Sequence, residues 1–185
     1  MALKSAICTA WGSPFTWTHA AYNMMNLKRP EGVEFRFYPG WGWCPARRHM
    51  YGVELALEWG STHICFLGAD QVHELDILEK YVKHIKNGRR IMTALTPVRG
   101  YADKAQKPFQ SVAWVVKDGK FELIDPSSAP LQEVDAVGSG TLLFETDILL
   151  KLKKPWFSES VVDENYNRET TMDTRFSYRL SRAAG

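Results

Sequence analysis

The sequence has no long apolar run and few cysteines. No run of the 185 residues approaches the roughly 18 apolar residues of a membrane span. The first four residues lead into no apolar segment of the signal-peptide kind, so we expect no signal peptide. Cys8, Cys44 and Cys65 form no CxxC pair, and a sparse, odd number of cysteines is typical of a reducing compartment. We therefore expect a cytoplasmic protein without a transmembrane segment.

An excess of charge of one sign is also missing. The chain has 23 Lys and Arg against 21 Asp and Glu, and the basic residues are spread along it without forming a block. This pattern lacks the electrostatic signature of nucleic-acid binding, so we expect no nucleic-acid partner. The segment Gly138-Ser139-Gly140 lacks the lysine and the spacing of a Walker A phosphate loop, which favours a bulge or a close backbone approach to a ligand.

Apolar and aromatic residues are plentiful. Apolar residues make up 45% of the chain, which includes seven Trp, seven Tyr and nine Phe, enough to bury a core without disulfides or metals. No internal repeat is visible. The length predicts a single domain over residues 1–185.

Strand and helix patterns alternate through the first half. Apolar or alternating runs predict strands at 6–10, 33–38, 63–67 and 90–95. Helical spacing predicts helices after Ser13-Pro14, at 46–59, and through Leu75, Leu78, Val82 and Ile85. This order predicts an α/β fold, a three-layer α/β/α sandwich with a mainly parallel central sheet.

The second half has a different pattern. Asp118-Gly119 predicts a hairpin between strands at 110–116 and 120–124, and further strands flank 138–140. A short helix is expected at 146–152 and a polar loop at 158–169. Met172, Phe176, Leu180 and Ala184 have the spacing of a final helix.

Candidate ligand-binding residues follow the predicted strands, because ligands of open α/β sheets bind at the carboxyl ends of strands. Asp70 follows the third strand, where a carboxylate can bind Mg²⁺ or Mn²⁺ or, alternatively, cap the turn into the next helix. His73 is either a further metal ligand or an ordinary residue of the helix's first turn. Trp41 and Trp43 follow the second strand, and would either stack on a sugar or nucleobase or plug the sheet edge.

Two more candidates lie near the C-terminus. Asp173 opens the last helix, so it is placed either as a general base or, three residues after Thr170, as part of a capping box, and both roles are compatible. Trp156 follows a proline and would form the floor of an acceptor site or pack in the core.

Several segments together resemble a known enzyme family. Ala46-Arg47-Arg48, the helix that ends at Glu58-Trp59-Gly60, and the strand from Thr62 to Asp70 resemble nucleotide-sugar glycosyltransferases of the GT-A fold, family-2 type. Residues 134–144, followed by 155–157, resemble the glycine-rich acceptor-side strand of that family, and residues 171–177 resemble its Glu-Asp motif. The resemblance covers nearly the whole chain.

The resemblance implies a GT-A (Rossmann-like) fold, with 1–100 as nucleotide-binding half and 101–185 as acceptor-side half. It implies transfer of a sugar from a UDP- or GDP-linked donor to a hydroxyl of a glycan or another acceptor. Asp70 would bind Mn²⁺ or Mg²⁺, and Asp173 would be the general base of an inverting reaction. The residues implied to contact the donor are Thr9, Ala10, Trp11, Arg47, Gly68, Ala69 and Asp70, and those implied to contact the acceptor are Trp43, Gly138, Ser139, Gly140 and Trp156.

The chain departs from the family pattern at two positions. Gly68 stands where the family has the first Asp of its Asp-x-Asp motif, and Met172 stands where it has Glu before Asp173. These departures favour an alternative, a nucleotide-sugar or glycan-binding module without turnover. A nucleotidyltransferase is a further alternative, but it requires a basic glycine-rich loop after the first strand, which residues 9–14 lack.

Overall fold

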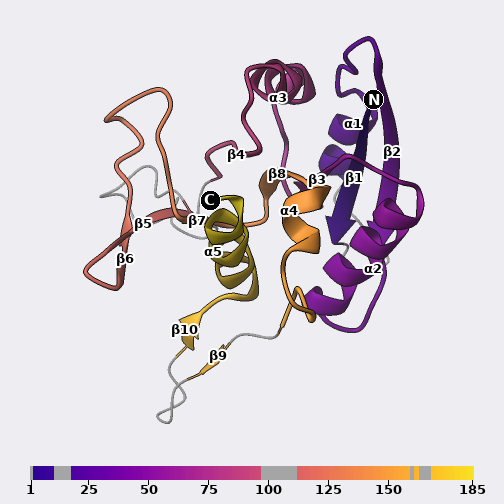
Figure 1. Ribbon diagram of the computed structural model, residues 1–185. Coiled ribbons are helices and arrows are strands. Elements are labelled where there is room, and N and C mark those ends of the chain that lie inside the picture. Colours follow the sequence, from indigo (N-terminus) through magenta and orange to yellow (C-terminus); the bar gives the residue numbers. More distant parts are fainter. Residues whose placement is uncertain (1, 11–17, 97–111, 159–160, 163–167) are drawn as a thin grey trace.

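A five-stranded mixed sheet forms the centre of the protein. The computed structural model describes residues 2–10, 18–96, 112–158, 161–162 and 168–185 (Figure 1). The sheet has the order β2-β1-β3-β8-β4. These strands are β2 (Val33–Gly40), β1 (Leu3–Ala10), β3 (His63–Leu67), β8 (Thr141–Glu145) and β4 (Ile91–Thr93).

Strand β8 makes the sheet mixed. β1 pairs in parallel with β2 and β3, whereas β8 lies between β3 and β4 and is antiparallel to both. The chain leaves β4 at the carboxyl edge and builds a small sheet before it returns, so the returning strand enters from that edge and runs in the opposite direction. The α/β class is confirmed, and the expectation of a mainly parallel sheet is corrected, since two of the sheet's pairings are antiparallel.

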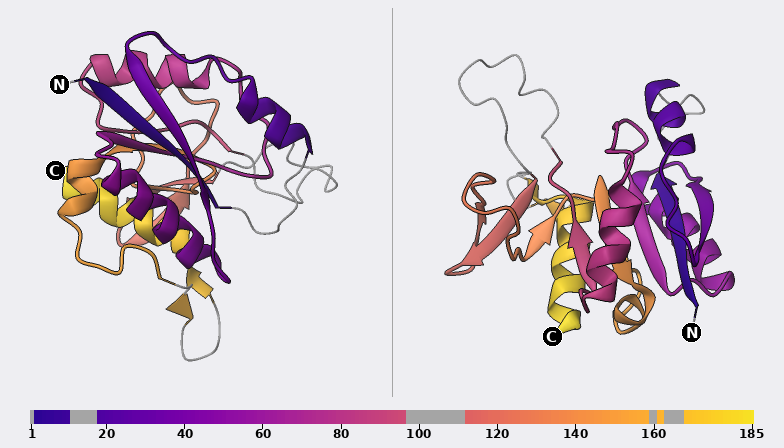
Figure 2. Two further views of the ribbon diagram at one scale, coloured as in Figure 1. Left: turned by 90° about the vertical axis from the view of Figure 1, so that its right-hand side faces the viewer. Right: turned by 90° about the horizontal axis from the view of Figure 1, so that it is seen from above.

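Helices cover both faces of this sheet (Figure 2). The helices are α1 (Thr18–Met25), α2 (Pro45–Glu58), α3 (Ile77–Lys86), α4 (Thr146–Leu150) and α5 (Met172–Ala184). Alternate residues of β3 point to opposite faces: Phe66 packs in the core shared with α2, α4 and α5, and Cys65 packs in the core shared with α3. The inner strands β1, β3 and β8 are therefore buried on both sides, as their apolar sequences predict.

A smaller sheet extends from the carboxyl edge. It has the order β6-β5-β7, formed by β6 (Lys120–Leu123), β5 (Ala113–Lys117) and β7 (Ala136–Val137). The hairpin expected at Asp118-Gly119 is confirmed, with φ angles of 50° and 75° at the two residues. The strands that flank residues 138–140 are also present, but β7 belongs to the small sheet and β8 to the main one.

Some predicted boundaries shift. Helix α3 begins at Ile77, not at Leu75, whose side chain is 47% exposed. The predicted loop at 158–169 contains parts of an antiparallel pair, β9 (Val161–Val162) and β10 (Arg168–Thr170). The helix start at Ser13-Pro14 and the boundary at residue 100 lie outside the described residues. In the described part of the chain, no helix has the length and apolarity that crossing a membrane requires.

Candidate functional site

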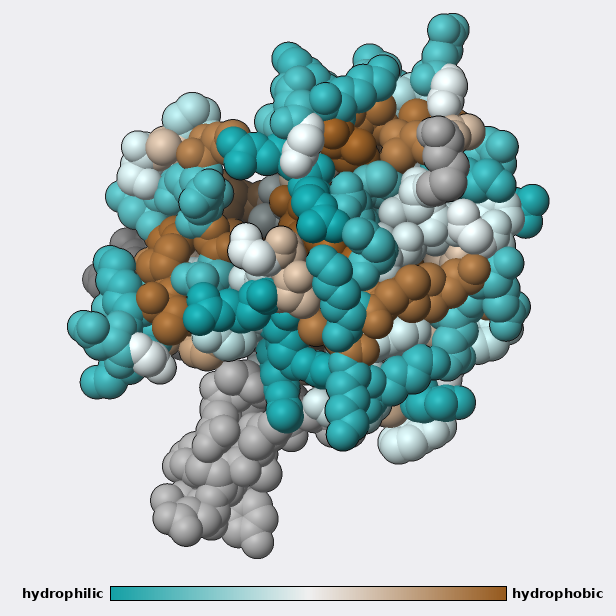
Figure 3. Space-filling model, viewed as in Figure 1, coloured by the Kyte–Doolittle hydropathy of each residue, from teal (hydrophilic) through white to brown (hydrophobic). Residues whose placement is uncertain are grey.

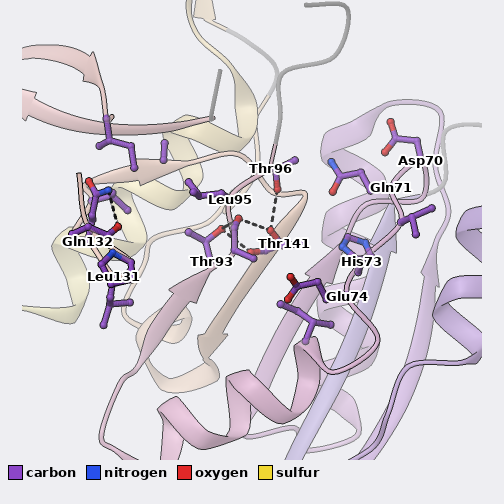
Figure 4. Close-up of a pocket in the computed structure, with 18 residues that line it drawn as sticks. Asp70, Gln71, His73, Glu74, Thr93, Leu95, Thr96, Leu131, Gln132 and Thr141 are labelled. Carbon is purple, nitrogen blue, oxygen red and sulfur yellow. Dashed lines mark hydrogen bonds between the residues drawn. The ribbon is translucent and has the colours of Figure 1, made fainter. Parts of the chain in front are cut away.

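A cleft of about 650 Å³ opens at the carboxyl edge of the main sheet. One wall is the segment that follows β3, from Asp70 to Ile77. The opposite wall is the segment 129–134, which connects β6 to β7 of the small sheet (Figure 4). The surface is visibly hollowed between the small sheet and the main sheet (Figure 3). The cleft lies where the sheet topology predicts ligand binding.

Threonines from β4 and β8 form the floor of the cleft. The Thr93 hydroxyl donates to the Thr141 carbonyl over 2.7 Å, and the hydroxyls of Thr96 and Thr141 lie 3.0 Å apart. The Tyr81 hydroxyl donates to the same Thr141 carbonyl from below, over 2.9 Å. These groups satisfy one another, so the floor is a fixed polar surface that needs no ligand to hold its shape.

Gly68 and Gly140 position the first wall. The Gly68 N–H donates to the Gly140 carbonyl over 2.8 Å, which joins the end of β3 to the segment before β8. A Cβ at Gly68 would lie 2.9 Å from Cδ of Gln71, and a Cβ at Gly140 would lie 2.6 Å from Nε2 of Gln71. The Gln71 side chain therefore occupies the space that side chains at 68 and 140 would take. Sequence reasoning missed Gln71, because nothing in the sequence places residue 71 beside residue 140.

Asp70 lies on the exposed rim of this wall (Figure 4). The turn is closed by the Gln71 N–H, which donates to the Gly68 carbonyl over 3.4 Å. The alternative role of Asp70 as a cap is wrong: α3 begins at Ile77, and Asp76 holds its N-cap position. Asp70 is thus a rim carboxylate, and a helix cap does not account for it.

Asp173 lies at the start of α5 and contacts the glycine segment. Its Oδ2 accepts the Ser139 N–H over 3.2 Å, and its Oδ1 accepts the Thr174 N–H over 3.0 Å and the Thr171 hydroxyl. The helix cap is Thr171, whose hydroxyl accepts from the Thr174 N–H over 3.4 Å, so the capping box expected from Thr170 is wrong by one residue. Three donors hold the Asp173 carboxylate in one orientation.

His49 on α2 is a second residue that sequence reasoning missed. Its ring packs against Phe66 and Phe157, at centroid distances of 4.9 and 5.3 Å, and its Nδ1 lies 3.0 Å from the Pro45 carbonyl. Burial lowers the pKa of His49, while the Pro45 carbonyl and the charge of Asp173 oppose that shift. His49 is thus buried in the core and lies within electrostatic reach of Asp173, a relation that helical spacing alone does not reveal.

The structure therefore joins three of the predicted segments. Asp70 follows Gly68, Gly68 is bonded to Gly140, and Ser139 is bonded to Asp173. The two candidate carboxylates are thus linked by backbone contacts at the same edge of the sheet. A Cβ at Gly138 would meet Val112 at 3.0 Å and the Asp173 Oδ2 at 3.5 Å, so the glycine allows this close approach.

Other predicted donor residues lie around the same edge but outside the lining of the cleft. The Thr9 side chain is buried, with its hydroxyl 3.8 Å from Sδ of Met24, and Ala10 ends β1. Arg47 is exposed in the first turn of α2. Ala69 lies between Gly68 and the rim residue Asp70, and Trp11 lies outside the described residues.

The tryptophans differ in burial. Trp41 and Trp43 are 58% and 83% exposed, so the expectation that they plug the sheet edge is wrong. Trp156 is buried in the core beside α4 and α5, and its Nε1 donates to the Leu152 carbonyl over 3.2 Å. Core packing therefore explains Trp156, and it does not line the cleft.

The donor set at the rim limits how a cation would be held. Among the residues that the structure describes, no three His, Cys, Asp or Glu side chains group together as a metal site. Mg²⁺ and related ions are often bound through one or two carboxylates together with substrate phosphates. Among the described residues, Asp70 would therefore supply one carboxylate to a cation, and the remaining ligands would have to come from a bound molecule or water.

Comparison with known proteins identifies the fold and leaves the family open. No family model matches the sequence, and no curated protein matches it. Among solved structures, a chain described as A197 from STIV superposes with a TM-score of 0.61 at 15% sequence identity. The match covers 96% of this chain and 78% of the other. At that identity the likeness concerns the fold alone.

Proposed function

We propose that this protein is a glycosyltransferase of GT-A type. It transfers a sugar from a UDP- or GDP-linked donor to a hydroxyl of a glycan or another acceptor. The observation that supports this best is the linkage of Asp70, which lines the cleft, to Asp173 through Gly68, Gly140 and Ser139 at the carboxyl edge of the sheet. Two carboxylates at one edge can supply the two groups that such a transfer needs, a general base for the acceptor hydroxyl and a ligand for the cation that binds the diphosphate.

Asp173 is the proposed general base. Its carboxylate is oriented by the Ser139 and Thr174 N–H groups, so its remaining lone pairs can face an acceptor hydroxyl. As the acceptor oxygen attacks the anomeric carbon, its proton passes to Asp173. The bond from that carbon to the diphosphate breaks, the diphosphate keeps the electron pair, and the anomeric configuration inverts.

Asp70 is the proposed contact to a Mn²⁺ or Mg²⁺ ion shared with the diphosphate. When bound, such an ion neutralises the charge of the diphosphate and fixes its position. Two exposed side chains follow the carboxyl end of β2. They are Trp43, in the loop after the strand, and Arg47, in the first turn of α2. We assign them supporting contacts to the acceptor and to the donor, respectively.

Two substitutions separate the two roles. Asp70→Ala removes the only side chain that we assign to the cation, so we expect it to abolish metal-dependent binding of the donor nucleotide. Asp173→Asn keeps an accepting oxygen for only one of the two N–H donors, Ser139 or Thr174, and cannot take the acceptor proton, so donor binding remains and transfer falls by about 10²–10⁴-fold.

Calorimetry measures binding, and release of free nucleotide in the presence of acceptor measures transfer. Glu58→Gln, at the exposed end of α2, is the matched control and leaves both unchanged. Equal loss of donor binding in Asp70→Ala and Asp173→Asn would contradict the assignment of roles. Binding with transfer unaffected by Asp173→Asn would favour a binding module without a catalytic base.

A further inference from the structure

Two polar side chains on one wall of the cleft lack a hydrogen-bond partner among the residues that the structure describes. The half-buried amide of Gln71 makes no hydrogen bond to any residue that the structure describes. His73 is 8% exposed, and its Nε2 is buried without a hydrogen-bond partner. Both line the cleft, and in Figure 4 they follow one another along the same wall, across from Leu131 and Gln132.

The surroundings place both side chains on this wall. The Gln71 amide lies against Gly68 and Gly140, where no Cβ would fit. The backbone of His73 exchanges two hydrogen bonds with the Asn23 side chain, of 2.7 and 2.8 Å. The buried His73 ring is therefore attached to a fixed backbone, which reduces the conformational freedom that binding a ligand would cost.

The unpaired atoms define the chemistry of the ligand. The Gln71 amide offers two donors and an acceptor. Nε2 of His73 has no hydrogen-bond partner among the described residues, and in the neutral ring it either donates or accepts a hydrogen bond, according to the tautomer. Burial also lowers the pKa of His73, which keeps the ring neutral. The wall thus needs a ligand that both donates and accepts hydrogen bonds.

A fully ionised phosphate group does not meet this requirement, whereas a sugar does. Its oxygens only accept hydrogen bonds, so they leave the Oε1 acceptor of Gln71 without a donor. Neighbouring hydroxyls on a sugar ring both donate and accept. A buried nitrogen without a partner is destabilising, and a hydroxyl that hydrogen-bonds to it removes that penalty.

We propose that Gln71 and His73 bind the hydroxyl groups of an uncharged sugar ring in this cleft. The inference rests on the proposed function, because the ring is either the transferred sugar of the donor or a sugar of the acceptor. It adds a specificity-determining pair that the resemblance to known enzymes does not supply.

The test compares the sugar's contribution to affinity in the full chain and in two variants. Gln71→Ala and His73→Phe are titrated with UDP, UDP-glucose, GDP, GDP-mannose and, separately, maltotriose. The expected result is a three- to tenfold weaker binding of the sugar-bearing ligand, the scale of one net hydrogen bond, with unchanged binding of the bare nucleotide. Asn87→Ala and His84→Phe, on and after α3 away from the cleft, are the matched controls.

The ligands distinguish the two sources of the sugar. A loss seen only with nucleotide sugars assigns the pair to the donor's sugar, and a loss seen with maltotriose assigns it to the acceptor. Because His73 is buried, folding of His73→Phe is checked by thermal melting. The half-exposed Gln71 gives an independent variant, and its side-chain NH₂ signals should shift in a ¹H–¹⁵N spectrum when sugar is added.

The outcomes separate this inference from the proposed function. If nucleotides bind, and neither Gln71→Ala nor His73→Phe weakens the binding of the sugar-bearing ligands relative to the bare nucleotide, the inference is overturned and the transferase proposal stands. If maltotriose shifts the Gln71 signals but no nucleotide binds, the inference stands and the transferase proposal fails. If neither nucleotides nor sugars bind, both are overturned.

Discussion

Replacing Gly140 by alanine tests the geometry of the cleft wall through the free energy of unfolding, which is measured without a ligand. The new Cβ would lie 2.6 Å from Nε2 and 2.8 Å from Oε1 of Gln71, and 3.0 Å from Cγ2 of Thr96. Overpacking of this kind costs about 1–3 kcal/mol in the free energy of unfolding. Because the Gln71 side chain is half-exposed and can rotate, we expect the lower end, about 1 kcal/mol.

A double-mutant cycle isolates the contact. Gln71→Ala removes the two nearest atoms that the new Cβ would meet and leaves Cγ2 of Thr96 at 3.0 Å, so in that background the cost of Gly140→Ala should fall by more than about 0.5 kcal/mol, the error of additivity for independent sites. Urea denaturation followed by tryptophan fluorescence gives each free energy of unfolding. Gln132→Ala, on the opposite wall, is the control background and should leave the cost of Gly140→Ala unchanged. An equal cost in all three backgrounds would refute the placement of Gln71 against Gly140.

Two further predictions concern stability. His49, His63 and His73 are buried, and burial lowers the pKa of each below its ordinary value of 6.5. The unfolded chain therefore binds protons near pH 6.5 that the folded chain does not, so the free energy of unfolding should fall as the pH drops from 7.5 through 6.5. Urea midpoints that stay constant over this range would contradict the burial of these rings. Phe144→Ala empties a fully buried site and should cost about 3–5 kcal/mol, whereas Leu150→Ala, 62% exposed, should change stability by less than about 0.5 kcal/mol.

The local elements could be predicted because their signals are local. The apolar run at 63–67, the Asp118-Gly119 turn and the spacing from Met172 to Ala184 each depend on neighbouring residues, and each element is present. The direction of β8 could not be predicted in the same way. It depends on where the chain goes between β4 and β8, and strand propensity carries no information on that path.

In the candidate site, too, the sequence predicts individual residues but not the contacts between distant segments. Asp70 and Asp173 were identified from their positions after a strand and before a helix. Their linkage depends on contacts between residues 68 and 140 and between 139 and 173, separations over which sequence periodicity says nothing. Gly68 in particular stands out in the sequence as a missing carboxylate. In the structure, that position is a glycine whose missing Cβ leaves room for the Gln71 amide.

The central claim is most directly tested by calorimetric titration of the full chain with UDP, GDP and their sugars, each in Mn²⁺ and in EDTA. The account predicts that one nucleotide binds in Mn²⁺, that EDTA abolishes this binding, and that Asp70→Ala does the same. Binding that survives both EDTA and Asp70→Ala would contradict the role of Asp70. The absence of binding by every nucleotide would contradict the proposal that the cleft edge is a donor site.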